Sequence, residues 1–406
     1  MKIETFALER WMTAWETKTP YDIAESGIYP MTVRELLAFE PSEERERILD
    51  RLLDLRLGYS EAPGTAELRS AIAATYRDTG PDEILVTTGA IEANFLLFNV
   101  LLEPGDHVVA VYPAYQQLYS VARAIGCEVS LWKLAPETGF RYDLDELERL
   151  TTSLTRLIVI NTPHNPTGAM LSRADLERIA AIAVSAGARI LSDEAYRWLE
   201  IPGGEPLAPP MRDITGGGPS GPPSPQRSSG ISVGTLSKPF GLPGLRIGWI
   251  AGSAELVAKC WAMRDYVSLS PGKLNDALAV LAFKHRGRIV ERTQAIVRRN
   301  LETARRWFEE NADTVSWTPP RGGLLAMMRY ALDIPSLELS NHLAEKYGVM
   351  LAPGSAFGIE HHLRIGIGQE PKVFAEGLGR TAACFADLRS AGVATRPARR
   401  SLVGSS

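Results

Sequence analysis

The chain of 406 residues contains only three cysteines, Cys127, Cys260 and Cys384, and they lie far apart in the sequence. Such scattered thiols give neither a disulfide framework nor the short spacings of a metal-binding cluster. No apolar run approaches the roughly 18 residues that a membrane-spanning helix needs. The first residues include acids where a secretory signal would be apolar, so we expect a protein of the reducing cytoplasm with no membrane partner.

The chain also has little net charge. It carries 44 Lys and Arg against 48 Asp and Glu, a formal net charge of −4. This balance gives no concentrated positive field, so a nucleic-acid partner is not expected. The hydrophobic fraction of 45% is typical of a soluble globular protein. At roughly 100–200 residues per domain, the length predicts two domains.

Short β-branched runs alternate with helical patterns over the first two thirds of the chain. Runs that are apolar on both faces predict an α/β fold, with a mostly parallel sheet between two layers of helices. Catalytic groups should then gather beyond the carboxyl ends of the strands. The predicted strands are residues 83–88, 108–112, 157–160, 188–192, 231–235 and 247–250.

The rest of the chain predicts a smaller α+β domain. A helical pattern over residues 275–311 is long enough to bridge two domains, and strands are expected at 324–330 and 363–367. Residues 202–230 hold 8 Pro and 7 Gly, which is typical of a long loop without regular structure. We therefore expect an N-terminal segment that joins the small domain, a large domain, an interdomain helix with the small domain, and a frayed tail, at residues 1–45, 46–272, 273–389 and 390–406.

The most informative segment is residues 235–249, with the sequence TLSKPFGLPGLRIGW. Lys238 follows a predicted strand, is flanked by hydroxyls and precedes a glycine-rich turn, where partial desolvation would favour the amine that forms a Schiff base. Arg246 offers a planar fork that suits a phosphate, and Thr235 offers a hydroxyl donor. A solvated loop lysine is the simpler interpretation of Lys238 alone. The three groups together favour a ligand with both a carbonyl and a phosphate.

With these residues in place, the chain resembles the pyridoxal-phosphate (PLP) aminotransferases of fold type I, class I/II, over nearly its whole length. The resemblance implies PLP as cofactor. Residues 86–93 resemble the strand-to-helix turn in which the backbone N–H groups of Gly89, Ala90 and Ile91 hold the cofactor phosphate at a helix N-terminus. Glu92 fits less well, because it is either an acid close to that phosphate or a first-turn charge that faces solvent.

The resemblance also implies which side chains surround the cofactor ring. Tyr115 would stack on the ring, while Asn165 would bind its 3′ oxygen and contact the substrate. Asp193 would pair with the pyridinium nitrogen and keep it protonated, which makes the ring an electron sink. Tyr196 would donate to the 3′ oxygen. Read alone, Tyr115 suits a buried core and Asp193 suits a helix cap, so these roles depend on the resemblance.

Two further segments match the family in order. Residues 57–69 resemble the segment in which Tyr59 reaches the phosphate of the neighbouring subunit's cofactor, which implies a homodimer with shared active sites. Residues 353–365 resemble the region whose arginine, here Arg364, grips the α-carboxylate of the amino acid substrate. Gly27 stands where the family has its substrate-binding glycine.

Fold and cofactor do not fix the reaction. Three stretches are most similar to the capreomycidine synthase branch, which cyclises 3-hydroxyarginine in antibiotic biosynthesis: residues 8–11, 21–29 and 264–270. Such a lyase must bind a guanidinium and exclude water. Glu9 is a candidate carboxylate for the guanidinium and Ser26 a candidate polar partner. Glu9 also suits the solvated face of a short helix, and Glu25 is an equally acidic neighbour.

Two other functions remain open at this stage. The first alternative is an ordinary aminotransferase that moves an amino group between an L-amino acid and a 2-oxo acid. The second is a cofactor-binding regulatory domain. Proteins of that kind carry a DNA-binding helical module ahead of the aminotransferase-like part, whereas only about 40 residues precede it here, so we expect an enzyme.

Overall fold

The computed structural model describes residues 2–201, 204–216 and 229–396. Its centre is a seven-stranded sheet with the spatial order β2-β8-β7-β6-β5-β3-β4. β8 runs antiparallel to both of its neighbours, and the other pairs are parallel. The strands are β2 (Ile84–Thr87), β3 (His107–Tyr112), β4 (Glu128–Lys133), β5 (Thr155–Asn161), β6 (Arg189–Asp193), β7 (Gly230–Thr235) and β8 (Gly248–Ala251).

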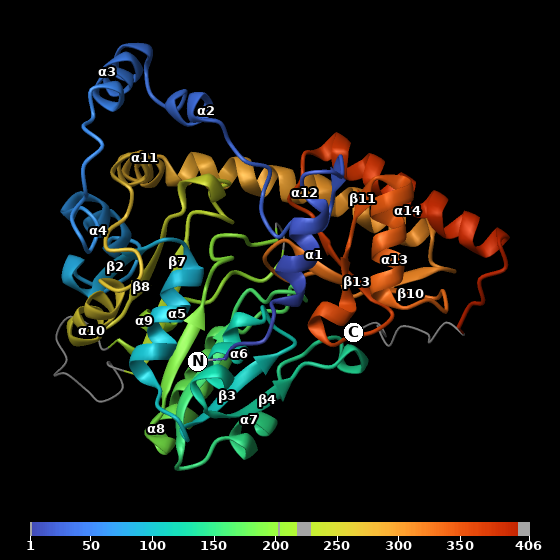
Figure 1. Ribbon diagram of the computed structural model, residues 1–406, viewed down its shortest axis with the longest axis horizontal. Coiled ribbons are helices and arrows are strands. Elements are labelled where there is room, and N and C mark those ends of the chain that lie inside the picture. The colour runs from blue at the N-terminus through green and yellow to red at the C-terminus, as the bar shows by residue number, and fades with distance from the viewer. Residues whose placement is uncertain (1, 202–203, 217–228, 397–406) are drawn as a thin grey trace.

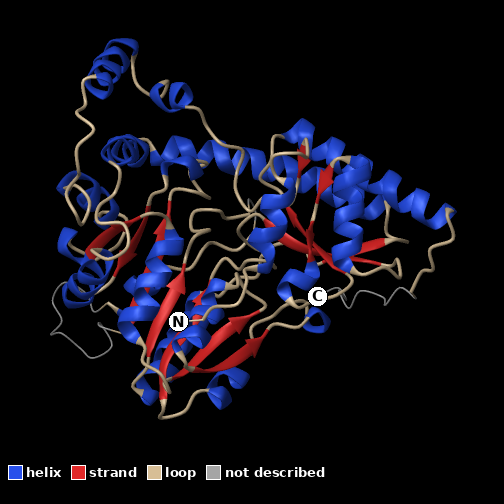
Figure 2. Cartoon of the chain, in the orientation of Figure 1, coloured by secondary structure: helices blue, strands red, loops and turns tan. Residues whose placement is uncertain are grey.

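Helices cover both faces of this sheet (Figure 2). One hydrophobic cluster joins the strands to α5, α6, α7, α8 and α10, and another joins β2 and β8 to α4 and α11. This arrangement confirms the predicted α/β class, in which a mostly parallel sheet lies between helices. The helices are α4 (Ala66–Ala73), α5 (Ala90–Leu101), α6 (Gln117–Ile125), α7 (Leu144–Leu150), α8 (Arg173–Ala186), α10 (Ala254–Arg264) and α11 (Lys273–Lys284).

The second part of the fold is a four-stranded antiparallel sheet in the order β12-β13-β10-β9, with a two-stranded parallel pair of β1 and β11 beside it. Its strands are β1 (Tyr21–Asp22), β9 (Val315–Trp317), β10 (Leu325–Tyr330), β11 (Val349–Met350), β12 (Ala352–Pro353) and β13 (His362–Gly366). Its helices are α1 (Ala7–Trp15), α12 (Arg286–Glu310), α13 (Ser336–His342) and α14 (Pro371–Ser390). Figure 1 shows both parts side by side.

The N-terminal segment divides between the two parts of the fold. α1 and the strand β1 pack on the smaller sheet. α2 (Val33–Leu37) instead places Leu36 and Leu37 in the cluster of α4 and α11, although residues up to 45 were expected on the small domain. α3 (Ser42–Leu53) follows, and the two helices form an arm at the upper left of Figure 1, which packs on the body through this hydrophobic cluster.

Three expectations about regular structure need correction. The helical region over 275–311 is two helices, because the backbone leaves the helical conformation at His285, whose ring is held by Glu40 at 2.8 Å. The segment 202–230 contains α9 (Met211–Thr215). Pro210 precedes its first turn, a position that proline tolerates, and Met211 N donates to buried Glu194 at 2.8 Å. Residues 217–228 lie outside the described part.

The third correction concerns residues 390–396, which were expected to be part of a frayed tail. Asp333 N donates to Ala394 O at 2.8 Å and Arg396 N donates to Ala331 O at 2.7 Å, so the chain is held to the small sheet through residue 396. Residues 397–406 lie outside the described part. Among the described residues, no helix combines the length and the apolar character that a membrane crossing requires.

Candidate active site

Lys238 lies three residues beyond the end of β7, between two side chains of the N-terminal segment. Its Nζ donates to Ser26 Oγ at 2.8 Å and lies 3.5 Å from Glu25 Oε1. Ser26 and Glu25 follow β1, so the pairing of β1 with β11 brings them to a lysine 212 positions away in the sequence. The site therefore forms where the two parts of the fold meet.

A glycine-lined cradle lies at the N-terminus of α5. Gly89 has φ +79° and caps the helix, a backbone conformation that favours glycine. A Cβ added to Gly248 would lie 2.4 Å from the carbonyl carbon of Gly89 and 2.5 Å from Ala90 N. A Cβ on Gly89 would lie 2.7 Å from Arg246 Nη2. The backbone N–H groups at the N-terminus of α5 lie beside the guanidinium of Arg246. Together they form a site that fits the phosphate of the expected cofactor.

Two hydroxyls lie between the cradle and Lys238. Thr235 Oγ1 lies 2.9 Å from Ile247 O and 3.0 Å from Ser237 Oγ, and it accepts from Ser237 N. A threonine has one hydroxyl proton, and the carbonyl of Ile247 can only accept. Thr235 therefore donates to Ile247 O and accepts from Ser237, which holds the turn together. Ser237, which the sequence interpretation left out of the site, is a candidate donor to the phosphate once its hydroxyl turns away from Thr235.

Asp193 ends β6 and is buried. Its Oδ2 accepts from Asn94 Nδ2 at 2.8 Å, and its Oδ1 accepts from Ala195 N at 3.1 Å. Burial raises the pKa of the Asp193 carboxyl, and the hydrogen bond from Asn94 opposes that rise. A protonated ring nitrogen would supply the missing counter-charge, so this carboxyl also fits PLP. Asn94 was missed, although a buried asparagine in the apolar sequence of α5 was a signal for it.

Two tyrosines line the space around Lys238. Tyr115 OH donates to Glu9 Oε1 at 2.9 Å, and its ring lies 4.7 Å from that of Phe6. Tyr196 is buried, and burial raises the pKa of its hydroxyl, while the charges of Lys238 and Arg364 oppose the rise. Their contacts with the cofactor ring stay a prediction of the resemblance.

Arg364 comes from β13 and is only 1% exposed. Its Nη1 donates to Asn165 Oδ1 at 3.2 Å and its Nη2 donates to Ala24 O at 2.8 Å. The Nε is buried and has no hydrogen-bond partner in the described part of the chain. A buried guanidinium with a spare donor, next to Asn165, suits the carboxylate of an amino acid.

Gly27 leaves room beside this cluster. A Cβ at that position would lie 3.0 Å from Glu25 Oε1, so a side chain there would crowd the carboxylate. Glu9, Glu25 and Asp22 all act electrostatically on Arg364. Burial, and then the negative charge of Glu25, raise the pKa of Asp22 to about 6. The wall of the site around Arg364 and Lys238 is therefore acidic.

Glu92 does not face solvent. It is buried, and its Oε2 accepts from Thr88 N at 2.5 Å and lies 3.7 Å from Arg264 Nε. Ser268 also donates to it. The solvent-facing alternative is thus wrong, because Arg264 provides a buried positive partner that the sequence pattern did not reveal.

Tyr59 lies on the surface and is 84% exposed. Ile91, in the first turn of α5, is also exposed. The contacts described above join Lys238 to Ser26, Arg364 to Asn165, and Tyr115 to Glu9. Tyr59 and Ile91 take no part in these contacts, and the role of Tyr59 toward a neighbouring subunit stays a prediction.

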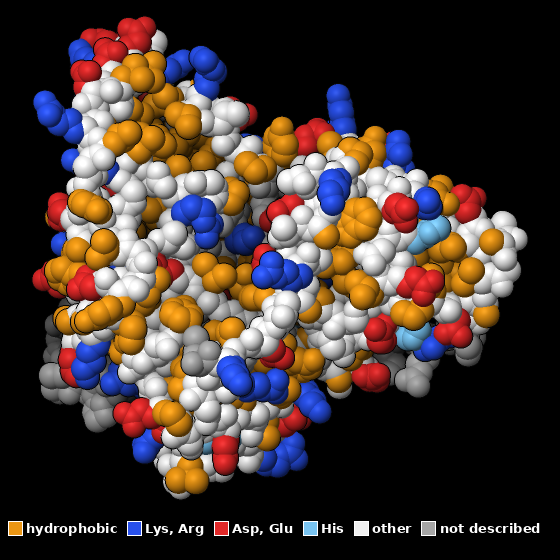
Figure 3. All heavy atoms as spheres, viewed as in Figure 1, with side chains coloured by type: hydrophobic (Ala, Val, Ile, Leu, Met, Phe, Trp, Pro, Cys, Tyr) orange, Lys and Arg blue, Asp and Glu red, His pale blue; other side chains and the backbone are white. Residues whose placement is uncertain are grey.

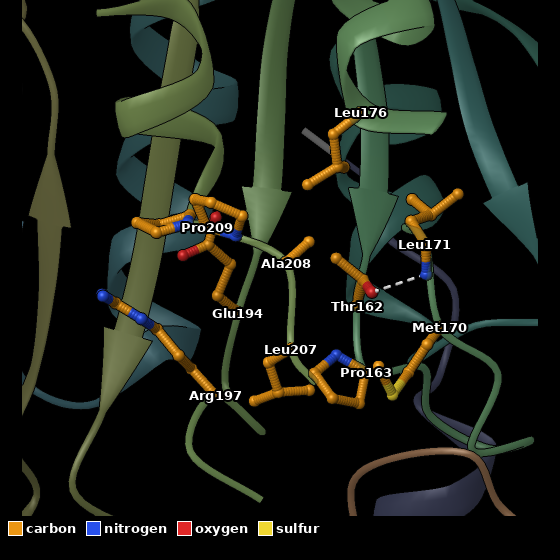
Figure 4. A pocket seen from close by; sticks show the side chains of 11 residues that line it. Thr162, Pro163, Met170, Leu171, Leu176, Glu194, Arg197, Leu207, Ala208 and Pro209 are labelled. Carbon is orange, nitrogen blue, oxygen red and sulfur yellow. Dashed lines mark hydrogen bonds between the residues drawn. The ribbon is translucent and has the colours of Figure 1, made fainter. Parts of the chain in front are cut away.

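A small pocket behind the site is a separate feature (Figure 4). It has a volume of about 20 Å³, enough for a water molecule, and Glu194, Arg197 and Leu207 are among its lining residues. Lys238 and Arg364 do not line it. No group of three His, Cys, Asp or Glu side chains within the described ranges is placed to hold a metal ion.

Comparisons with known proteins agree with this geometry. The family model "Aminotransferase class I and II" matches residues 41–380. Capreomycidine synthase from Streptomyces vinaceus is 34% identical over 88% of each chain. A PLP-dependent aminotransferase structure from Streptococcus suis is 34% identical, with a TM-score of 0.87 over 96% of this chain and 99% of that one. The structure of the PLP-dependent cyclase OrfR is 30% identical, with a TM-score of 0.83 over 95% and 98%. The chain is a member of the aminotransferase class I and II family, with pyridoxal phosphate as its cofactor.

Proposed function

We propose that this enzyme dehydrates and cyclises 3-hydroxyarginine to capreomycidine, a step of antibiotic biosynthesis. The observation that carries the proposal is the acidic wall of the site, where Glu9 and Glu25 lie beside Tyr115 and Lys238. A carboxylate there offers a charge-assisted contact to a guanidinium. The similarity of the chain to a capreomycidine synthase and to a PLP-dependent cyclase supports the same function.

We also propose which residues hold the cofactor. We assign the phosphate to the N–H groups of Gly89, Ala90 and Ile91 with Arg246 and Ser237, and the ring to Asp193, Asn165, Tyr115 and Tyr196. Thr235 supports this set through the turn. When bound, PLP draws electrons from the bonds of the substrate Cα into its ring. Lys238 is the residue that anchors it.

The chain's own groups handle the protons and the orientation of the substrate. Arg364 holds the α-carboxylate, and Lys238 removes and returns the Cα proton from its position between Ser26 and Glu25. The β-hydroxyl leaves as water, and a guanidine nitrogen loses one proton as it bonds to Cβ. The balance is the loss of one water without any oxidant or second amino acid. α1 contacts the site through the hydrogen bond between Glu9 and Tyr115, and we infer that it limits the entry of water, which this chemistry requires.

We also propose a homodimer with shared active sites. The chain exposes Tyr59 at 84% and Leu57 at 81%, and hydrophobic side chains gather on the surface around the α2 and α3 arm (Figure 3). Exposed apolar surface of this extent is typical of an interface. Tyr59 would then reach the phosphate of the partner's cofactor. Sedimentation of the holoenzyme should give twice the chain mass, and a monomer would contradict this assignment.

The cyclase and the aminotransferase alternatives are separated by one incubation. We expect 3-hydroxyarginine alone, with holoenzyme and no 2-oxo acid, to give a cyclic product lighter by one water, without a 2-oxo acid. Lys238→Ala should abolish this conversion. Transfer of an amino group from arginine or an aromatic amino acid to 2-oxoglutarate, without dehydration of 3-hydroxyarginine, would instead establish the aminotransferase and overturn the cyclase.

A further inference from the structure

Glu25 occupies an unusual position for an acid, because it contacts the lysine that must carry the cofactor. Its Oε1 lies 3.5 Å from Lys238 Nζ, while Ser26 Oγ accepts the hydrogen bond from that nitrogen. Burial opposes ionisation of Glu25, but the positive charges of Lys238 and Arg364 outweigh it and lower its pKa. The Glu25 side chain is still 44% exposed, so a ligand can reach it.

The turn that carries Glu25 is fixed by its own backbone. Asp22 Oδ1 accepts from Ala24 N at 2.9 Å and from Glu25 N at 3.0 Å. Asp22 thereby orients Glu25. Burial is the main cause of the raised pKa of Asp22, and the negative charge of Glu25 adds to the rise. A positive charge placed in the same field is favoured.

Substrate binding weakens both positive charges that now balance Glu25. Lys238 must be an uncharged amine before it can take the Cα proton, and the α-carboxylate of any amino acid substrate neutralises Arg364. Glu25 and Glu9 then remain without a cation unless the substrate brings one. A partly buried carboxylate without a partner is costly, so the site selects for a positive side chain.

We propose that Glu25 is an exchangeable counter-ion, which holds the ammonium of Lys238 in the free chain and the cationic side chain of the substrate in the complex. This inference rests on the proposed function for the identity of the cation, a guanidinium. Ring closure requires the guanidinium to fold back until a nitrogen is about 3–3.5 Å from Cβ. Cβ is one bond from the Cα that Lys238 must reach, so the folded-back guanidinium lies near Glu25. Glu9 is instead committed to Tyr115.

The test compares two ligands of nearly equal shape, L-arginine and uncharged L-citrulline. Each is titrated into wild-type, Glu25→Gln and Glu9→Gln holoenzymes, with rapid mixing, and binding is read from the visible band of the cofactor. We expect the wild type to bind arginine at least tenfold more tightly than citrulline. Glu25→Gln should reduce this ratio to about one while citrulline affinity stays within twofold. Glu9→Gln should keep most of the preference, and Glu25→Asp should restore part of it.

The outcomes are separable from the fate of the cyclase proposal. Arginine and citrulline lack the 3-hydroxyl, so neither can lose water, and the ratio does not depend on cyclisation. Failure of 3-hydroxyarginine to cyclise would overturn the proposed function and leave the ratio as it is. A preference for arginine that survives Glu25→Gln overturns the role of Glu25. Equal affinity of the wild-type enzyme for arginine and citrulline would also overturn the role of Glu25. This measurement does not depend on the folding of any variant.

Discussion

Asn94 donates a hydrogen bond from its Nδ2 to Asp193 Oδ2 over 2.8 Å, and both side chains are buried. The bond ties the second turn of α5 to the end of β6, so one helix positions both the phosphate cradle and the carboxylate assigned to the ring nitrogen. We expect Asn94→Leu to weaken cofactor binding about tenfold or more, because a hydrogen bond to a charged group contributes about 1.5–3 kcal/mol. Titration of the apoenzyme of each variant with PLP measures the dissociation constant of the cofactor.

Asn99 is a matched control on the same helix. Its Nδ2 donates to Phe95 O at 2.8 Å, within α5 itself. Asn99→Leu should leave PLP affinity unchanged. Equal losses in the two variants would show that α5 merely tolerates no leucine, and would remove the assigned role of Asn94.

The close approach of Gly248 to the start of α5 gives a second prediction. A methyl group at this position would meet backbone atoms of Gly89 and Ala90 at 2.4–2.5 Å, and neither can move without shifting the helix. Overpacking of this kind costs about 1–3 kcal/mol. Gly248→Ala should therefore lower both the melting temperature and PLP affinity. Gly244→Ala, where an added Cβ meets no described atom within 4 Å, should change neither.

The buried pair of Arg264 and Glu92 makes a stability prediction. Arg264→Met leaves the Glu92 carboxylate buried without its cation, which should lower the free energy of unfolding by about 3 kcal/mol. The double variant Arg264→Met with Glu92→Gln should recover part of this loss, because the amide is neutral. Denaturant unfolding measures both. Arg178→Met, which breaks an exposed pair with Asp145, should have no measurable effect, and a similar loss there would contradict the argument from burial.

The sequence predicted the central strands because they are buried on both faces and therefore read as continuous β-branched runs. The sequence did not predict β4, because β4 is an edge strand that begins and ends with the charged residues Glu128 and Lys133. The sequence did not predict α9 either, because this helix is stabilised by hydrogen bonds to Glu194 and Ser232, which are remote in the sequence. Local composition cannot reveal such partners.

The sequence likewise predicted some residues of the candidate site and missed others. Residues at strand ends, such as Lys238 and Asp193, follow patterns that a sequence displays. The choice between Glu9 and Glu25 depends on where the chain after β1 lies relative to β7, and no spacing rule encodes that contact. Asn94 and Arg264 act through another residue. The polar Asn94 in the apolar sequence of α5 was a signal, but its partner, like that of Arg264, is identified only by the packing of α5 and α10.

Asp22 gives the last prediction, which concerns pH. Its pKa rises from 3.8 to about 6 on folding, so folding favours the protonated acid. Between pH 3.8 and pH 6 the carboxyl is ionised in the unfolded chain but still protonated in the folded chain. Ionisation stabilises only the unfolded chain in this range, so the free energy of unfolding falls as the pH rises from about 4 to about 6. Asp22→Asn removes the titration and keeps the Oδ1 acceptor for Ala24 N and Glu25 N. The stability of this variant relative to wild type should grow by about 2 kcal/mol from pH 4 to pH 8. Denaturant unfolding at the two pH values measures the difference, and an advantage that does not change with pH would mean that Asp22 is ionised in the folded chain throughout.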